Sequence, residues 1–295
     1  MNMKPHQINR LGPRSGAAVI AFHCSGSGAG QWRPLAEALG ESFELRAPEH
    51  YGCNSRGVWS GEHAFTLADE AAAAISLIDH LEGKVHLVGH SYGGGVALHV
   101  ALARPERIAS LALYEPSAFH LLPHLGDAGR AAHGEISQVA RRICEAVITG
   151  DYSAGMRVFV DYWNGAGAWR AMSPRVQDAL LRWAPNAPLE FHALLQEPAL
   201  PDAYGQLDVP VLLLRGENAP LPTRIITGTL GEYFPRSRFA EMSGAGHMGP
   251  FTHAAAVASL FAGHIEAAAA QLAHFGAPNN LAAHLPTFLP RRLTS

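Results

Sequence analysis

Short apolar runs recur along the chain and alternate with segments that have helical composition. The runs, each about as long as a buried strand, are Ala18 to His23, Phe43 to Ala47, Lys84 to Val88, Ile108 to Tyr114, Val209 to Arg215 and Arg238 to Met242. The helical segments are Trp32 to Leu39, Leu67 to Leu81, Gly94 to Ala103, Ile225 to Tyr233 and Ala254 to Leu272. This alternation predicts an α/β fold with a mostly parallel central sheet and helices on both faces.

The alternation stops between Glu115 and Leu207, where the pattern predicts helices and no strand. These helices are expected at Gly134 to Thr149, Ser153 to Trp163, Arg175 to Trp183 and Leu189 to Leu195. We therefore expect a core of residues 1–119 and 205–275, with an inserted helical cap of residues 120–204. Residues 276–295 are irregular and rich in proline, which predicts a tail that wraps the surface or docks on the partner subunit of a homodimer.

The segment Gly89-His90-Ser91-Tyr92-Gly93 joins the third apolar run to the third helical segment. A strand, a Gly-x-Ser-x-Gly turn and a helix together predict a nucleophile elbow, a turn so tight that its flanking residues must be nearly free of side chain. Sites in parallel sheets form beyond the carboxyl ends of the strands, and the elbow would hold Ser91 there. The alternative is a serine in an ordinary strand-to-helix loop.

Composition excludes several classes of protein. The chain has 295 residues, of which 48% are hydrophobic and 16% charged, so it can bury a large core. A formal net charge of −3 provides no basic field, and we expect no binding to nucleic acid. The start of the chain lacks the apolar core of a signal peptide, and later segments lack a long uninterrupted apolar stretch, so we expect a cytoplasmic location and no membrane insertion.

Cysteine and histidine usage argues against metal sites. Cys24, Cys53 and Cys144 are odd in number and widely spaced, which favours reduced thiols over disulfides or a zinc site. The chain has 17 histidines, but they are scattered, and the helically spaced pair His120 and His124 has no carboxylate beside it. We expect no metal and no organic cofactor.

A serine hydroxyl needs a base within hydrogen-bond reach and an acid that orients the base. The best candidate base is His247, in the glycine-rich segment 243–250 between the last strand and the last helical segment. Small residues there would let the ring reach the elbow. The alternative is a loop histidine exposed to water.

The elbow, the glycine-rich histidine loop and the cap insertion resemble the α/β-hydrolase superfamily from Ala18 to Phe275. In that superfamily a His-Gly-x loop after the first strong strand helps to build an oxyanion hole, and the matching segment here is His23-Cys24-Ser25-Gly26. The resemblance implies that the backbone N–H groups of Ser25 and Tyr92 hold the oxyanion. Cys24 stands where glycine is usual. Alternatively, the small residues only prepare the start of the helix that follows.

The position of the acid departs from the common pattern. Most relatives have an aspartate three residues after the glycine that ends the strand Val211 to Gly216, and this chain has Ala219 there. Some members, similar to pancreatic-type lipases and one branch of the haloalkane dehalogenases, have the acid after the strand that follows the elbow helix. Glu115 matches that location, 24 positions after Ser91. The alternatives are that Glu217 or Asn218 substitutes, or that Glu115 only anchors the cap.

These assignments predict a carboxylesterase-like serine hydrolase that acts on a small ester, thioester, lactone or related carbonyl compound beneath the cap. Ser91 would be the nucleophile, His247 the base and Glu115 the acid that orients it. The segment after the first strand also resembles hydrolases that cleave carbon–carbon bonds, although those keep the acid at the position of Ala219. The sequence is also compatible with a cofactor-free lyase and with a catalytically weak ligand-binding protein.

Overall fold

The computed structural model describes residues 8–12, 16–53 and 56–276. Its sheet has seven strands in the order β1-β3-β2-β4-β5-β6-β7, and all neighbours are parallel except β1 and β3. The strands are β1 (Ile8–Arg10), β2 (Ala17–Phe22), β3 (Phe43–Pro48), β4 (Val85–His90), β5 (Ile108–Tyr114), β6 (Val211–Gly216) and β7 (Ser237–Met242). The expected mostly parallel α/β sheet is confirmed.

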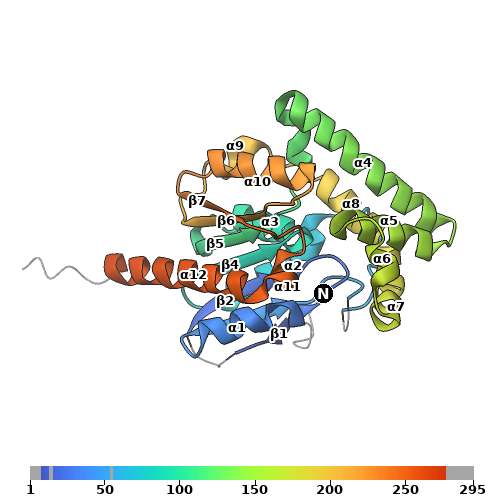
Figure 1. The fold of residues 1–295 in the computed structure, drawn as a ribbon. Helices are drawn as coiled ribbons and strands as arrows, with labels where there is room; N and C mark the ends of the chain where they lie inside the picture. The colour runs from blue at the N-terminus through green and yellow to red at the C-terminus, as the bar shows by residue number, and fades with distance from the viewer. Residues whose placement is uncertain (1–7, 13–15, 54–55, 277–295) are drawn as a thin grey trace, which may run out of the picture.

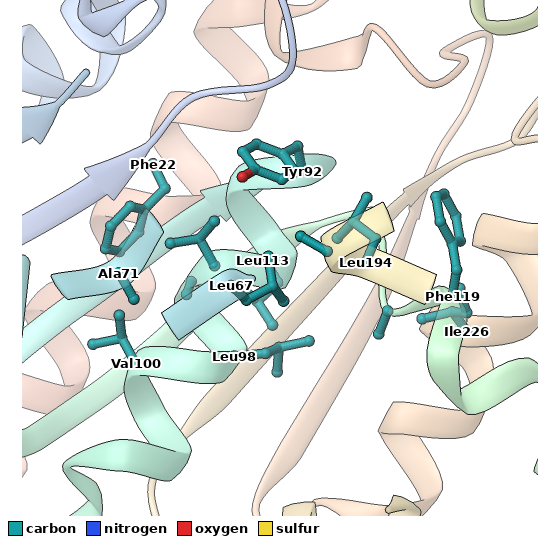
Figure 2. Close-up of a cluster of buried hydrophobic side chains, with 14 of the residues drawn as sticks. Phe22, Leu67, Ala71, Tyr92, Leu98, Val100, Leu113, Phe119, Leu194 and Ile226 are labelled. Carbon is teal, nitrogen blue, oxygen red and sulfur yellow. The ribbon is translucent and has the colours of Figure 1, made fainter. Parts of the chain in front are cut away.

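Side chains alternate along the strands, so the sheet buries an apolar layer on each face. Along β2, Val19 and Ala21 belong to one layer, whereas Ile20 and Phe22 belong to the other. Figure 2 shows the second layer, in which Phe22 lies with side chains from two helices that cover this face. The core helices are α1 (Arg33–Leu39), α2 (Leu67–His80), α3 (Tyr92–Ala103), α10 (Leu221–Tyr233), α11 (Gly249–Thr252) and α12 (Ala254–Gly276), with short 3₁₀ turns η2 (Ala29–Trp32) and η3 (Pro105–Arg107).

The six apolar runs all form strands, but the sequence pattern missed β1, the start of α10 and the start of α4 (Gly126–Ile148), which the pattern places at Gly134. β1 has three residues and pairs antiparallel at the sheet edge, which is too short for a recognisable alternation. α10 begins at Leu221 rather than Ile225 because Pro222 lies in its first turn, where a missing N–H costs no intrahelical bond.

Between β5 and β6 the chain folds into helices only. Figure 1 shows the larger of these helices grouped at one end of the sheet, beside the loops that follow the strands. They are η4 (Phe119–His124), α4 (Gly126–Ile148), α5 (Tyr152–Asn164), α6 (Ala168–Ala171), α7 (Pro174–Trp183), η5 (Ala184–Asn186), α8 (Ala187–Leu195) and α9 (Pro201–Tyr204). The division into a core and a cap of residues 120–204 stays a prediction, and the tail expected after Gly276 lies outside the described residues.

By length and composition alone, α12 could cross a membrane. Its segment Ala254–His274 has a mean hydropathy of 1.2, and 39% of the scored window is buried. The buried side chains include Val257, Phe261 and Ile265, which pack in the layer shared with α1. The core helix of a soluble protein meets the same criteria, so this observation is weak evidence for a span, and the expected absence of membrane insertion stays a prediction.

The two glycines Gly93 and Gly134 are expected to respond oppositely to alanine. A Cβ at position 93 would lie 2.3 Å from Phe22 O, whereas a Cβ at position 134, inside α4, would meet nothing within 4 Å. Gly93→Ala should lower the free energy of unfolding by about 1–3 kcal/mol. Gly134→Ala should raise it by about 0.5–1 kcal/mol because alanine favours a helix. Chemical denaturation measures both, and an unchanged midpoint for Gly93→Ala would contradict the close packing of the elbow.

Candidate active site

Ser91 occupies the turn between β4 and α3 in a strained backbone conformation, with φ of 54° and ψ of −122°. A Cβ at position 89 would lie 2.6 Å from Gly93 O, which explains the glycines on both sides of the turn. The Ser91 N–H donates to Tyr114 O (3.1 Å), and Ser91 O accepts from the Ser117 N–H (2.9 Å). Contacts from β5 and its following loop therefore hold the strained residue in place.

His247 lies in the loop between β7 and α11, and its Nε2 is 2.8 Å from Ser91 Oγ. The last residue of β5 holds this loop, because Tyr114 Oη donates to Gly246 O (2.7 Å). It also packs closely on Gly216, where an added Cβ would lie 2.5 Å from Ala245 O. The small residues of the loop thus let a buried histidine reach the elbow.

Glu115 follows β5 directly and points its carboxylate at the other side of the His247 ring, with Oε2 2.7 Å from Nδ1. The carboxylate is fully buried and accepts two more hydrogen bonds, from Gly216 N (2.9 Å) and from Thr223 Oγ1 (2.9 Å). Glu115 has φ of 40°, an uncommon value for a residue with a side chain. A backbone that is held in this way indicates that the position of the carboxylate is tightly constrained.

The alternative acids do not meet His247. Glu217 is exposed and accepts hydrogen bonds from Gly244 N (2.8 Å) and Ser243 Oγ (3.2 Å), which lower the pKa of its carboxyl group. Asn218 is also exposed, and Ala219 is buried. The structure therefore brings Ser91, His247 and Glu115 together and leaves Glu217 on the outside of the histidine loop.

This arrangement fixes the direction in which a proton can move. A carboxylate only accepts hydrogen bonds, so His247 Nδ1–H donates to Glu115 and Nε2 is free to accept from the Ser91 hydroxyl. The base thus faces the nucleophile with its unprotonated nitrogen. Such a chain is able to take the serine proton while an acid stabilises the resulting imidazolium.

Ser25 and Tyr92 are placed so that their amides can face the same space. Ser25 lies in a turn that is closed by a hydrogen bond from the Ser27 N–H to Cys24 O (3.3 Å), and Gly26 in this turn has φ of 64°. Ser25 and Ser91 line the same small cavity. Tyr92 is the first residue of α3, so no carbonyl within that helix accepts its N–H. Their function as oxyanion donors stays a prediction.

A buried bridge that no sequence motif indicates joins this turn to the histidine loop. Gln31 Oε1 accepts from Cys24 N (3.0 Å), and Gln31 Nε2 donates to His90 Nδ1 (3.0 Å). His90 Nε2–H then donates to His247 O (2.8 Å). Burial, together with the nearby His247, lowers the pKa of His90 well below its ordinary value and keeps this ring neutral. His90 therefore connects two loops of the site.

Three further residues beside the nucleophile or base are not indicated by the sequence motifs. Trp163 from α5 stacks on the His247 ring, with centroids 4.1 Å apart, and Ser117 Oγ lies 3.3 Å from Ser91 Oγ. Glu190 from α8 is buried and hydrogen bonds to Ser25 Oγ. Its signal in the sequence is a glutamate between Leu189 and Phe191, a charged residue in an otherwise apolar segment.

A cavity of about 530 Å³ opens beside Ser91 and His247, between the inserted helices and the core. Its wall is mainly apolar and includes Phe159, Val160, Trp163, Met172, Leu180, Met248 and Phe251. A second, water-sized cavity of about 10 Å³ is lined by Ser25, Ser91, Ser117 and Glu190 together with aromatic and aliphatic residues. Among the described residues, no group of three or more histidine, cysteine, aspartate or glutamate side chains is placed to hold a metal ion.

Comparison with known proteins is consistent with this geometry. Residues 19–260 match the model of the alpha/beta hydrolase family. The chain belongs to this family. It is 30% identical over 175 residues to the lipase LipV of Mycobacterium tuberculosis, covering 59% of each protein. The chain thus spans less than two thirds of the length of such curated relatives.

Solved structures of alpha/beta hydrolases share the fold. An enol-lactonase from Burkholderia xenovorans LB400 superimposes with a TM-score of 0.69 at 16% identity, covering 88% of this chain and 95% of that one. A thermophilic esterase from Thermogutta terrifontis gives 0.68 at 22% identity, covering 88% and 93%. At these identities the likeness supports the fold alone.

The three free cysteines should differ in their reaction with iodoacetamide. Burial raises the pKa of Cys24 to about 12 and that of Cys53 well above its ordinary value, and both thiols are shielded. Cys144 is only half-buried. At neutral pH the native protein should therefore be alkylated at Cys144 first, and at the other two after denaturation, as read by peptide mass spectrometry. Rapid native alkylation of Cys24 would contradict its buried position.

Proposed function

We propose that this protein is a serine hydrolase that cleaves a small ester, thioester or related carbonyl substrate through an acyl-enzyme on Ser91. The observation that carries the proposal is the continuous chain from Ser91 Oγ through His247 to Glu115, with links of 2.8 and 2.7 Å. A strained serine, a histidine and a buried acid in this order are the parts that acyl transfer requires. The similar proteins named above, a lipase, an esterase and an enol-lactonase, have names that agree with this chemistry.

In the first half of the reaction, Ser91 Oγ attacks the substrate carbonyl carbon, and its proton moves to His247 Nε2. The carbonyl oxygen becomes an oxyanion, which accepts hydrogen bonds from the amides of Ser25 and Tyr92. When the tetrahedral intermediate collapses, the bond to the leaving group breaks and His247 returns the proton to that group. Glu115 stabilises the imidazolium while His247 holds the serine proton, and it does not accept that proton itself.

In the second half, water attacks the acyl-enzyme. His247 Nε2 accepts a proton from the water as its oxygen bonds to the acyl carbon, and then delivers it to Ser91 Oγ as the ester bond breaks. The products are a carboxylic acid and the free serine. The stacked Trp163 covers one face of the His247 ring, so the ring keeps the orientation that both halves need.

The large cavity indicates which kind of substrate fits. A volume of about 530 Å³ lies within the range of small-molecule sites, and its apolar wall favours a hydrocarbon or aromatic portion on the substrate. The polar groups in that wall include Ser25, Ser91 and His247, which meet where the carbonyl would lie. We therefore propose a carbonyl compound with one sizeable apolar substituent.

Labelling with a fluorophosphonate, read by mass spectrometry of the intact protein and its peptides, tests the proposal. The wild type should be labelled once, at Ser91, and Ser91→Ala should not be labelled. Glu115→Gln should slow labelling by about 100-fold or more, because the carboxylate no longer stabilises His247. Glu217→Gln is the matched control: an exposed glutamate of the neighbouring loop, whose loss should leave the rate within about twofold.

Hydrolysis of a panel of p-nitrophenyl esters should follow the same order among the four proteins. Equal slowing in Glu115→Gln and Glu217→Gln would remove Glu115 from its proposed role. A wild type that neither reacts with the probe nor turns over any ester would favour a ligand-binding function instead.

A further inference from the structure

Glu190 is a buried acid beside the nucleophile that the proposed reaction does not yet use. It projects from α8 of the insertion and lines the water-sized cavity together with Ser25 and Ser91. One carboxyl oxygen, Oε1, accepts from Trp183 Nε1 (3.1 Å), and the other, Oε2, hydrogen bonds to Ser25 Oγ. The cavity thus brings a carboxyl group, the Ser25 hydroxyl and the nucleophile to one place.

The surroundings of Glu190 favour its uncharged form. The charged group that acts on Glu190 is Glu70, which is also an acid. Glu70 is itself paired with Arg56 at 2.8 Å. Burial, reinforced by the like charge of Glu70, therefore raises the pKa of Glu190 well above its ordinary value.

The position of its single proton follows from the partners. An indole N–H only donates, and the carbonyl oxygen is the better acceptor of an uncharged carboxyl group, so the bond from Trp183 favours Oε1 as the carbonyl oxygen. In the uncharged acid the proton is then on Oε2, and the bond between Oε2 and Ser25 Oγ runs from the acid to the serine oxygen, whereas an ionised Glu190 would accept from Ser25. Ser25 Oγ is the acceptor in this bond, which leaves its own hydrogen free to turn to another acceptor. Ser25 and Ser91 both line the same small cavity.

We propose that the protonated Glu190 is a positioning residue that donates to Ser25 Oγ, so that the Ser25 hydroxyl becomes a third donor to the oxyanion formed on Ser91. This inference rests on the proposed acyl-transfer function and adds a side-chain donor to the two backbone amides. A donor aimed at a developing charge in a small buried cavity lowers the barrier more than it improves substrate binding. Glu190 belongs to the insertion, so this donor is oriented only when α8 is seated on the core.

A double-mutant cycle on the full chain, assayed with a p-nitrophenyl ester, tests the inference. Ser25→Ala keeps the amide and removes the hydroxyl, so kcat should fall about 100-fold with KM changed less than about threefold. Glu190→Leu should lower kcat about 10-fold, and Glu190→Gln, whose amide also donates on one side and accepts on the other, should recover most of that loss. Because Glu190 acts through Ser25, the double variant Ser25→Ala/Glu190→Leu should be no slower than Ser25→Ala alone.

Two further measurements separate this role from simple support of the loop. A trifluoromethyl ketone forms an oxyanion adduct on Ser91, so Ser25→Ala should weaken its binding by the factor lost in kcat/KM. The infrared difference spectrum between wild type and Glu190→Gln at neutral pH should contain the C=O stretch of a protonated carboxyl group, which requires no active variant. Carboxylate bands alone would overturn the inference, as would additive losses in the cycle.

The controls distinguish failure of this inference from failure of the proposed function. Loss of turnover in Ser91→Ala together with unchanged kcat in Ser25→Ala would overturn the third donor and leave the acyl-enzyme proposal standing. Full turnover in Ser91→Ala would overturn both.

Discussion

The site depends on one costly burial, that of the Glu115 carboxylate. An ionised carboxylate without partners in a protein interior is strongly unfavourable, so it must be surrounded by donors. Three donors meet it here, from the end of β6, from α10 and from His247. They come from segments about a hundred residues away in sequence. The acid is therefore accommodated only when the carboxyl edge of the sheet is complete, and the same bonds place the histidine over Ser91.

Much of this architecture is predictable because local patterns determine it. The buried strands β2 to β6 have six or seven residues each and leave clear apolar runs, and the elbow needs glycine at positions where the structure has no space for a Cβ. The acid was also open to prediction, since the end of β5 lies next to the elbow in a parallel sheet. Ala219 in the common position argued against the usual aspartate, while Glu217 and Asn218 of the same loop stayed open as alternatives.

Other parts of the site were beyond the reach of the sequence for a physical reason. The insertion contributes Trp163 and Glu190, which are distant in sequence from the residues they contact, and helix periodicity does not say how separate helices cross. Gln31 likewise gives no local signal of its bonds to Cys24 and His90. Contacts of this kind depend on tertiary packing, and only the folded structure identifies them.

The location of Glu115 has a consequence for how the machinery is distributed along the chain. The proposed nucleophile and the proposed acid lie within 25 residues, because Ser91 joins β4 to α3 and Glu115 directly follows β5. Only the proposed base, His247, is distant in sequence from Ser91. The segment that follows β6 therefore does not need to supply the acid. It contacts the histidine loop through residues 216–218. Substitutions or insertions at the exposed positions 217 and 218 would therefore leave Ser91 and Glu115 unchanged. These two residues are encoded together in one strand-helix-strand module.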